Sequence, residues 1–310
     1  MIINTGSRTD VPAFYSRWLL NRIREGFVLV RNPYNPQQVT KYLLDPELVD
    51  LIAFCTKNPA PILPHMHELD RFRQFWFVTI TAYGRDIEPN VPPAGDVIES
   101  FRKLSDHVGV NAVGWRYDPI FIDDKHTLQW HVKAFERMAA ELSGYTKQVV
   151  ISFIDLYEKT KRNFPDVRQV SSEERFVIGE AFARIAENNG MAIRGCAEGT
   201  DLDKFGVDSG GCMTKRILED AIGERLLVPK SEPRARQECE CLLGRDIGAY
   251  NTCMHDCIYC YANYDKRRVR QNVRFHDSDS PFLIGNSMPG DKIHLARQES
   301  FISDQIMMEL

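Results

Sequence analysis

Three cysteines near the C-terminal end of the sequence are spaced so that one loop could bind an iron–sulfur cluster. They are Cys253, Cys257 and Cys260, with the spacing C-x3-C-x2-C. Three thiolates are one fewer than the four that a structural zinc ion or an ordinary [4Fe-4S] cluster takes from a protein. Such a loop leaves one coordination position open, and an open position is where a metal centre can do chemistry.

This spacing, with the aromatic Tyr259 directly before the last cysteine, is typical of radical S-adenosylmethionine enzymes. In those enzymes the fourth iron binds the amino and carboxylate groups of S-adenosylmethionine, and the cofactor carries the difficult chemistry. We expect reductive cleavage to a 5′-deoxyadenosyl radical, which abstracts hydrogen from a substrate that the sequence does not identify. The simpler alternative is a zinc knuckle that is completed by His255, by another cysteine, or by no further residue.

Four further cysteines form a candidate second metal centre. Together they supply the four thiolates of a second iron–sulfur cluster or of a structural zinc site. The alternative is a set of buried thiols, because the single residue between Cys239 and Cys241 is a short link for two ligands of one ion. The four residues are Cys196, Cys212, Cys239 and Cys241.

Length and composition are those of an ordinary globular protein. The chain has 310 residues, of which 43% are hydrophobic and 26% charged. No apolar run reaches the roughly 20 residues of a membrane span, and the N-terminus lacks the features of a signal peptide, so we expect a cytoplasmic protein with reduced cysteines. The net charge of −4 gives no strong sign of nucleic-acid binding.

The first two thirds of the sequence repeat a unit of a short apolar strand, a polar turn and a helix. Apolar residues three or four apart, as at Val97 and Phe101, predict helices with one buried face. Ser171 and Glu174 have capping-box spacing at the start of another helix. Seven such units, the second of them starting with a strand at 27–30, and a weak eighth strand at 226–228 predict an α/β fold of the TIM-like (β/α) barrel type, closed or nearly closed.

We expect two parts that pack as one structural unit. Residues 1–228 form the barrel, and residues 229–310 form a cysteine-rich segment that binds the cluster. Active sites of such barrels lie at the C-terminal ends of the strands. The cysteine loop follows the last strand instead of the first, but these two strands are neighbours in a closed barrel. The loop can therefore still cover the active-site rim.

Polar residues that follow the predicted strands are expected to line a pocket at this rim. Each of them alone could equally have a structural role, such as capping a helix or forming an ion pair. The candidate catalytic residues are Arg8, Asp10, Lys57, Arg116, Asp118, Asp155 and Glu198. The same rim is expected to carry Arg31, Asn32, Asn58 and Tyr83.

Several segments along nearly the whole chain resemble an uncharacterised family, domain of unknown function 1848. The segments are SRTDVPAFY at 7–15, TKNP at 56–59, WRYDP at 115–119, DIGAYNTC at 246–253 and YCYAN at 259–263. The resemblance implies a radical S-adenosylmethionine-like protein and names no substrate. The cluster loop also resembles that of spore photoproduct lyase, over those few residues alone. The family pattern has tryptophan where this chain has Cys55, which favours a core position for that cysteine.

Two other functions stay open at this point. One is a metal-dependent barrel hydrolase or endonuclease with a structural zinc site, and the other is a non-enzymatic iron–sulfur electron carrier or sensor. A hydrolase needs metal-binding histidines at strand ends, whereas most of the eight histidines fall in predicted helices or loops. An electron carrier would not need an extended polar rim. A radical enzyme that receives electrons from a donor such as flavodoxin or ferredoxin is therefore the favoured interpretation.

Overall fold

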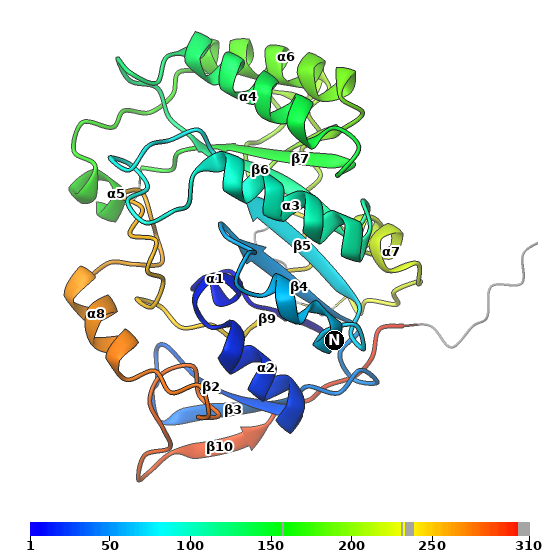
Figure 1. Cartoon of the computed structure of the whole chain (residues 1–310), viewed down its shortest axis with the longest axis vertical. Helices are drawn as coiled ribbons and strands as arrows, with labels where there is room; N and C mark the ends of the chain where they lie inside the picture. The colour runs from blue at the N-terminus through cyan, green and yellow to red at the C-terminus, as the bar shows by residue number, and fades with distance from the viewer. Residues whose placement is uncertain (157, 231, 233–238, 303–310) are drawn as a thin grey trace, which may run out of the picture.

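The computed structural model describes residues 1–156, 158–230, 232 and 239–302 (Figure 1). Parts of the predicted C-terminal segment, at 231, 233–238 and 303–310, lie outside the described residues. The strands are β1 (Ile2–Asn4), β2 (Phe27–Arg31), β3 (Gln38–Leu43), β4 (Leu51–Thr56), β5 (Gln74–Thr79), β6 (Val113–Ile120), β7 (Gln148–Phe153), β8 (Ala192–Gly195), β9 (Arg245–Asp246) and β10 (Lys292–Leu295). The helices are α1 (Val11–Phe14), α2 (Ser16–Glu25), η1 (Leu63–Glu68), α3 (Ala94–Val108), α4 (Leu128–Leu142), α5 (Glu158–Asn163), α6 (Ser172–Asn188), η2 (Asp203–Phe205), α7 (Lys215–Ile222) and α8 (Lys266–Arg274).

A seven-stranded parallel sheet forms the centre of the molecule. Its strand order is β8-β7-β6-β5-β4-β1-β9, and helices α3, α4 and α6 cover one of its faces (Figure 1). The α/β class predicted from the alternation of strands and helices is therefore confirmed. Among the residues that the structure describes, β8 pairs with β7 alone and β9 with β1 alone, so the pairings give no ring of strands.

The predicted strand at 27–30, which is β2, does not belong to this sheet. Strands β2 and β3 form an antiparallel hairpin, which β10 extends into a separate three-stranded sheet. The link 32–37 is too short for the crossover that a parallel pair requires, so a hairpin is the only connection it permits. The predicted strand at 226–228 is also wrong, because Leu226 makes only an isolated antiparallel bridge to Ile302. Strand β9 occupies the place beside β1 instead.

Aromatic side chains fill the space between the sheet and its helices. The rings of Phe54 and Trp76 stack with their centroids 3.8 Å apart, as do those of Phe135 and Phe182. On α3 the predicted apolar face is buried, with Phe101 fully enclosed. The predicted capping box at Ser171 is present at the start of α6.

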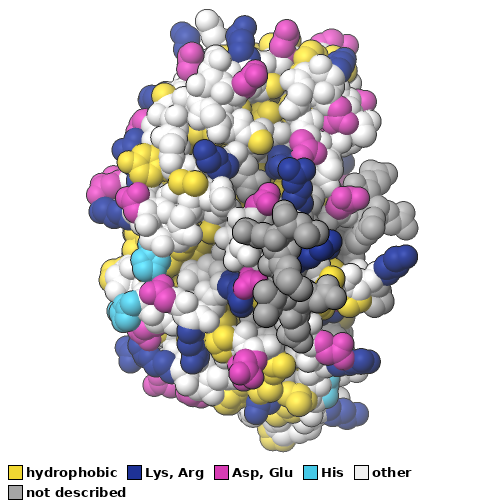
Figure 2. Space-filling view, turned by 90° about the vertical axis from the view of Figure 1, so that its right-hand side faces the viewer, with side chains coloured by type: hydrophobic (Ala, Val, Ile, Leu, Met, Phe, Trp, Pro, Cys, Tyr) yellow, Lys and Arg dark blue, Asp and Glu magenta, His cyan; other side chains and the backbone are white. Residues whose placement is uncertain are grey.

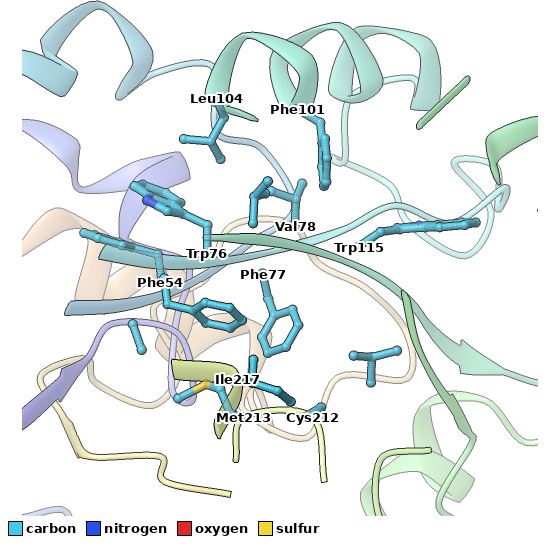
Figure 3. Packing of buried hydrophobic residues seen from close by; sticks show 14 of the residues in the cluster. Phe54, Trp76, Phe77, Val78, Phe101, Leu104, Trp115, Cys212, Met213 and Ile217 are labelled. Atoms are coloured by element: carbon cyan, nitrogen blue, oxygen red, sulfur yellow. The ribbon is translucent and has the colours of Figure 1, made fainter. Parts of the chain in front are cut away.

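The other face of the sheet is filled by the segment that leads into α7. Figure 3 shows Phe77 pointing toward Met213 and Ile217, on the side of the sheet opposite to Phe101 and α3. Cys212 lies beside these residues. Apolar side chains thus fill the face of the sheet opposite α3, which we call the inner face. The polar side chains of this face lie at the C-terminal ends of the strands.

The surface is charged and mixed. Lys and Arg side chains are interspersed with Asp and Glu side chains over the face shown in Figure 2. Helix α8, which follows the cysteine loop, is basic and has no buried residue among its nine. No helix in the described ranges has the length and apolar character that would let it cross a membrane.

Candidate functional site

The three predicted cluster cysteines lie on one tightly closed loop, residues 251–263. The N–H of Asn251 donates to the carbonyl of Ala262 across the base of the loop, at 3.0 Å. The side chain of Asn251 accepts the N–H of Tyr264 at 2.9 Å. Asn251 and Asp256 both have left-handed backbone angles, with φ of 56° and 58°, which asparagine and aspartate tolerate better than most residues. These features make the chain turn back on itself around the cysteines.

Hydrogen bonds fasten this loop to the C-terminal ends of the strands. Tyr15, next to α1, donates its hydroxyl to the carbonyl of Thr252 at 2.6 Å. Asn90, in the connection from β5 to α3, donates its side-chain N–H to the carbonyl of Met254 at 2.8 Å. The hydroxyl of Tyr261 donates to the carbonyl of Ser7, beyond β1, at 2.8 Å. The loop therefore lies over the ends of β1 and β5.

Both ring nitrogens of His255 face oxygen atoms of the protein. One ring nitrogen lies 2.8 Å from Oδ2 of Asp10 and the other lies 3.4 Å from the carbonyl of Asn90. The ring is buried and packs against Phe14 with centroids 4.5 Å apart. Because both nitrogens face protein oxygens, this arrangement does not favour the alternative in which His255 completes a zinc knuckle.

Asp10 links the loop to two strands. Its carboxylate caps α1 through the N–H of Ala13 at 3.0 Å and accepts the N–H of Lys57, beyond β4, at 2.7 Å. It also contacts His255 at 2.8 Å. Asp10 thus does more than cap a helix, since it positions the loop relative to β1 and β4.

The cysteine sulfurs lie in a buried environment that contains N–H donors. Burial raises the pKa of all three thiols, that of Cys257 to about 12. Backbone N–H groups near the sulfurs act against this shift and lower the pKa, that of His255 at Cys253 and those of Ala262 and Asn263 at Cys260. Such donors stabilise negative charge on sulfur once a metal has replaced the protons.

Lys57 and Glu88 form a buried ion pair beside the loop. Nζ of Lys57 lies 2.9 Å from Oε1 of Glu88, which also accepts the hydroxyl protons of Thr81 and Tyr259. Burial alone would lower the pKa of Lys57, but Glu88 and the sulfur of Cys257 outweigh it and raise that pKa. The predicted Lys57 and Tyr259 therefore both contact the carboxylate of Glu88, which was not among the predicted rim residues. The signal for Glu88 was its place in the connection that follows β5.

A second polar group lies at the end of β6 and β7. The guanidinium of Arg116 pairs with Oδ2 of Asp118 at 2.5 Å, and the hydroxyl of Ser152 donates to Oδ1 of Asp118. Burial raises the pKa of Asp118, but Arg116 and Ser152 outweigh burial and the net shift is downward. Both predicted residues lie within β6, whereas the sequence suggested a loop after the strand. The positive charge of Lys57 also lowers the pKa of Asp118, so this group lies near the ion pair beside the cysteine loop.

The remaining predicted rim residues are spread around the same end of the sheet. Nε of Arg8 lies 3.8 Å from Oδ1 of Asp246 in β9, at the opposite edge from Glu198. Glu198 accepts the N–H of Phe153 at 2.8 Å. Asp155 is exposed, and its charge acts on Glu198. Asn58 caps the turn after β4 by accepting the N–H of Ala60 at 3.1 Å, and Tyr83 donates to the carbonyl of Pro119 at 2.8 Å.

Arg31 and Asn32 are not part of this rim. Arg31 ends β2 in the separate sheet and forms an ion pair with Asp291 at 2.5 Å. Asn32 accepts the N–H of Tyr34 in the turn after β2. Their assignment to the rim is wrong because the short link after β2 makes a hairpin, so β2 lies in the separate sheet.

Cys55 lines the interior as expected. It lies near the end of β4, packs against the main core, and burial raises its pKa to about 12. A Cβ atom at Gly6 in the neighbouring segment would lie only 2.3 Å from Cβ of Cys55. A glycine is therefore required where the end of β1 passes this thiol.

Glu198 is expected to make the stability of the protein depend on pH. Burial raises its pKa from 4.5 to about 7, although the N–H of Phe153 and the charge of Arg175 act in the other direction. Between these two values the folded carboxyl holds a proton that the unfolded one releases, so the free energy of unfolding falls as pH rises, by about 3 kcal/mol in total. The stabilisation is complete below pH 4.5 and is lost as pH passes about 7. Urea unfolding of Glu198→Gln at several pH values should show a flatter dependence, and an unchanged slope would contradict the assignment.

The candidate second centre is partly assembled. The sulfurs of Cys212 and Cys241 lie 3.7 Å apart, and the proximity of Cys212 raises the pKa of the Cys196 thiol. Within the described ranges, however, no three His, Cys, Asp or Glu side chains are arranged so that they could hold a metal ion.

Comparison with known families identifies the family of this chain. The model of a family described as domain of unknown function (DUF1848) matches residues 2–262. The chain belongs to this family. The match confirms the resemblance seen in the sequence, and it spans both the sheet and all three cysteines of the loop. The family description names no activity, and no curated protein matches the chain.

Proposed function

We propose that this protein is a radical S-adenosylmethionine enzyme whose [4Fe-4S] cluster is held by Cys253, Cys257 and Cys260. The observation that carries the proposal is the loop 251–263, which a hydrogen bond from Asn251 to Ala262 closes and which carries all three cysteines. When bound, such a cluster supplies an open iron for S-adenosylmethionine and the electron that cleaves the cofactor.

The residues of the loop suit this group. Burial keeps the free thiols protonated, so loading a cluster requires that protons leave, and the N–H donors then stabilise the thiolates. Ligands of a cluster bind different iron atoms and are spaced more widely than ligands of one ion. This requirement is compatible with the lack of a single-ion arrangement in the described residues. Oδ1 of Asn263 is buried without a hydrogen-bond partner among those residues, next to Cys260 in the fold, and is a ready acceptor for a bound cofactor.

The surrounding side chains have separate roles in this proposal. Asp10 and His255 hold the loop in place. Lys57 and Glu88 place a fixed pair of charges beside Cys257. The polar group of Arg116, Asp118 and Ser152 lies on the same inner face and would bind a polar substrate. We further propose that the sheet curves into a nearly closed barrel in a cytoplasmic enzyme, and that a flavodoxin or ferredoxin supplies the electron.

Reductive cleavage of S-adenosylmethionine tests the proposal. Protein reconstituted without oxygen should contain about four irons at this loop. After reduction with dithionite and addition of S-adenosylmethionine, chromatography should detect 5′-deoxyadenosine and methionine. Colourless protein that contains zinc in this loop, or iron-loaded protein that forms no 5′-deoxyadenosine, would overturn it.

A further inference from the structure

The remaining cysteines lie on segments that flank the two end strands of the sheet and the start of α7. Cys196 directly follows β8, and Cys241 lies shortly before β9. Cys212 lies on the segment that leads into α7, on the inner face of the sheet (Figure 3). Residues from three distant parts of the chain therefore bring thiols to one buried location, with Cys212 and Cys241 almost fully enclosed.

The spacing of the two enclosed sulfurs is that of two thiols in contact, and it is also compatible with two ligands of one tetrahedral ion. Sγ of Cys212 and Sγ of Cys241 are 3.7 Å apart. Zinc–thiolate bonds of about 2.3 Å in a tetrahedron place any two sulfurs about 3.8 Å apart. A disulfide would bring them to about 2.05 Å. Cysteines of an iron–sulfur cluster bind different irons, so their sulfurs would be farther apart than those of one ion.

The backbone at Gly211 leaves room for these sulfurs. A Cβ atom at Gly211 would lie 3.1 Å from Sγ of Cys241 and 3.5 Å from Sγ of Cys239. The φ angle of Gly211 is 125°, a conformation that a residue with a side chain rarely adopts. The sulfurs of Cys239 and Cys241 therefore both lie close to Gly211, directly before Cys212, and Cys196 lies near enough to Cys212 that Cys212 raises the pKa of its thiol.

Donors around the sulfurs are suited to a negatively charged thiolate site. The N–H groups of Cys212 and Met213 donate to Sγ of Cys241 at 3.2 and 3.3 Å. Nη1 of Arg116 donates to Sγ of Cys212 at 3.5 Å. Four thiolates and one zinc ion carry a net charge of about −2, which N–H donors and a guanidinium stabilise.

We propose that Cys196, Cys212, Cys239 and Cys241 bind a structural zinc ion that ties the end of β8 to the segment entering β9. The ligands of this site are separate from the three cysteines of the loop, and the site shares Arg116 with the polar group proposed to bind substrate. Binding requires the side chains of Cys196 and Cys239 to turn toward the Cys212–Cys241 pair, because the described side chains do not yet converge on one point. The ion would close the sheet through its ligands in place of strand pairing.

Metal analysis of full-length variants tests this inference. A variant with Cys253, Cys257 and Cys260 all changed to alanine removes the other cysteine loop and should retain about one zinc per chain, without iron. Adding Cys241→Ala should remove that zinc, whereas adding Cys55→Ala, at a half-buried thiol outside the set, should not. Iron with sulfide in the triple variant, no stoichiometric metal, or zinc that persists after Cys241→Ala would overturn the proposal.

X-ray absorption at the zinc edge keeps the test decisive if Cys241→Ala does not fold. The triple-alanine variant should give a single shell of four sulfurs at about 2.3 Å. A shell that contains nitrogen or oxygen ligands would contradict the four-cysteine site.

Discussion

Cys257→Ala is expected to abolish both cluster binding and formation of 5′-deoxyadenosine. Two cysteines cannot hold three irons of a cluster, so iron bound at this loop should fall from about four per chain to well below one. Cleavage of S-adenosylmethionine should fall more than about 100-fold, since loss of a metal ligand costs at least as much as loss of its outer partners. Iron, sulfide and 5′-deoxyadenosine are measured on the same anaerobic preparations.

Cys55→Ala is the matched control for this variant. Cys55 is also an interior thiol with a raised pKa, but it lies at the end of β4 and outside the loop. It should keep the iron content and cleavage activity of the unaltered protein. The proposal fails if Cys257→Ala retains its iron and activity. Equal losses in both variants would instead show that any interior thiol is required for folding.

Glu88→Gln should destabilise the protein more than any other neutral change considered for the rim. Lys57 and Glu88 are both largely buried, with side chains 14% and 4% exposed. Replacing the carboxylate by an amide leaves the ammonium of Lys57 inside the protein without its partner charge, which costs about 3 kcal/mol or more. Urea unfolding of the metal-free protein measures this loss.

Two comparisons show whether the cost comes from the unpaired charge. The double variant Lys57→Met with Glu88→Gln should recover most of the lost stability, because no buried charge is then left unpaired. Glu99→Gln removes the partner of Lys103 in an exposed pair on α3 and should change the unfolding midpoint little. Equal effects of Glu88→Gln and Glu99→Gln would contradict a buried pair with a structural role.

The sequence was sufficient for those parts of the fold that depend on local patterns. Apolar periodicity predicted α3 and α4, and the Ser171–Glu174 spacing predicted the start of α6. The alternation of strands and helices predicted the parallel sheet. It failed at β2, where strand propensity was correct but partner choice depended on the length of the following link. It also missed β9, because two residues are too few to give a periodic signal.

The sequence predicted which residues belong to the candidate site, but not which of them contact one another. Spacing selected Cys253, Cys257 and Cys260, and strand ends selected Lys57 and Asp118. The pairings of Lys57 with Glu88 and of Asp10 with His255 join residues that are 31 and 245 positions apart. Such pairings follow from how the loop folds over the sheet, which no local pattern encodes. The approach of Cys212 to Cys241 likewise depends on the fold of the segment before α7.

Electron paramagnetic resonance of the reduced protein, with and without S-adenosylmethionine, tests the central claim most directly. A three-cysteine [4Fe-4S] cluster with an open iron should give a signal on reduction, and this signal should change when the cofactor binds the open iron. A cluster signal that S-adenosylmethionine leaves unchanged, or the absence of any cluster signal in protein whose loop holds zinc, would contradict it.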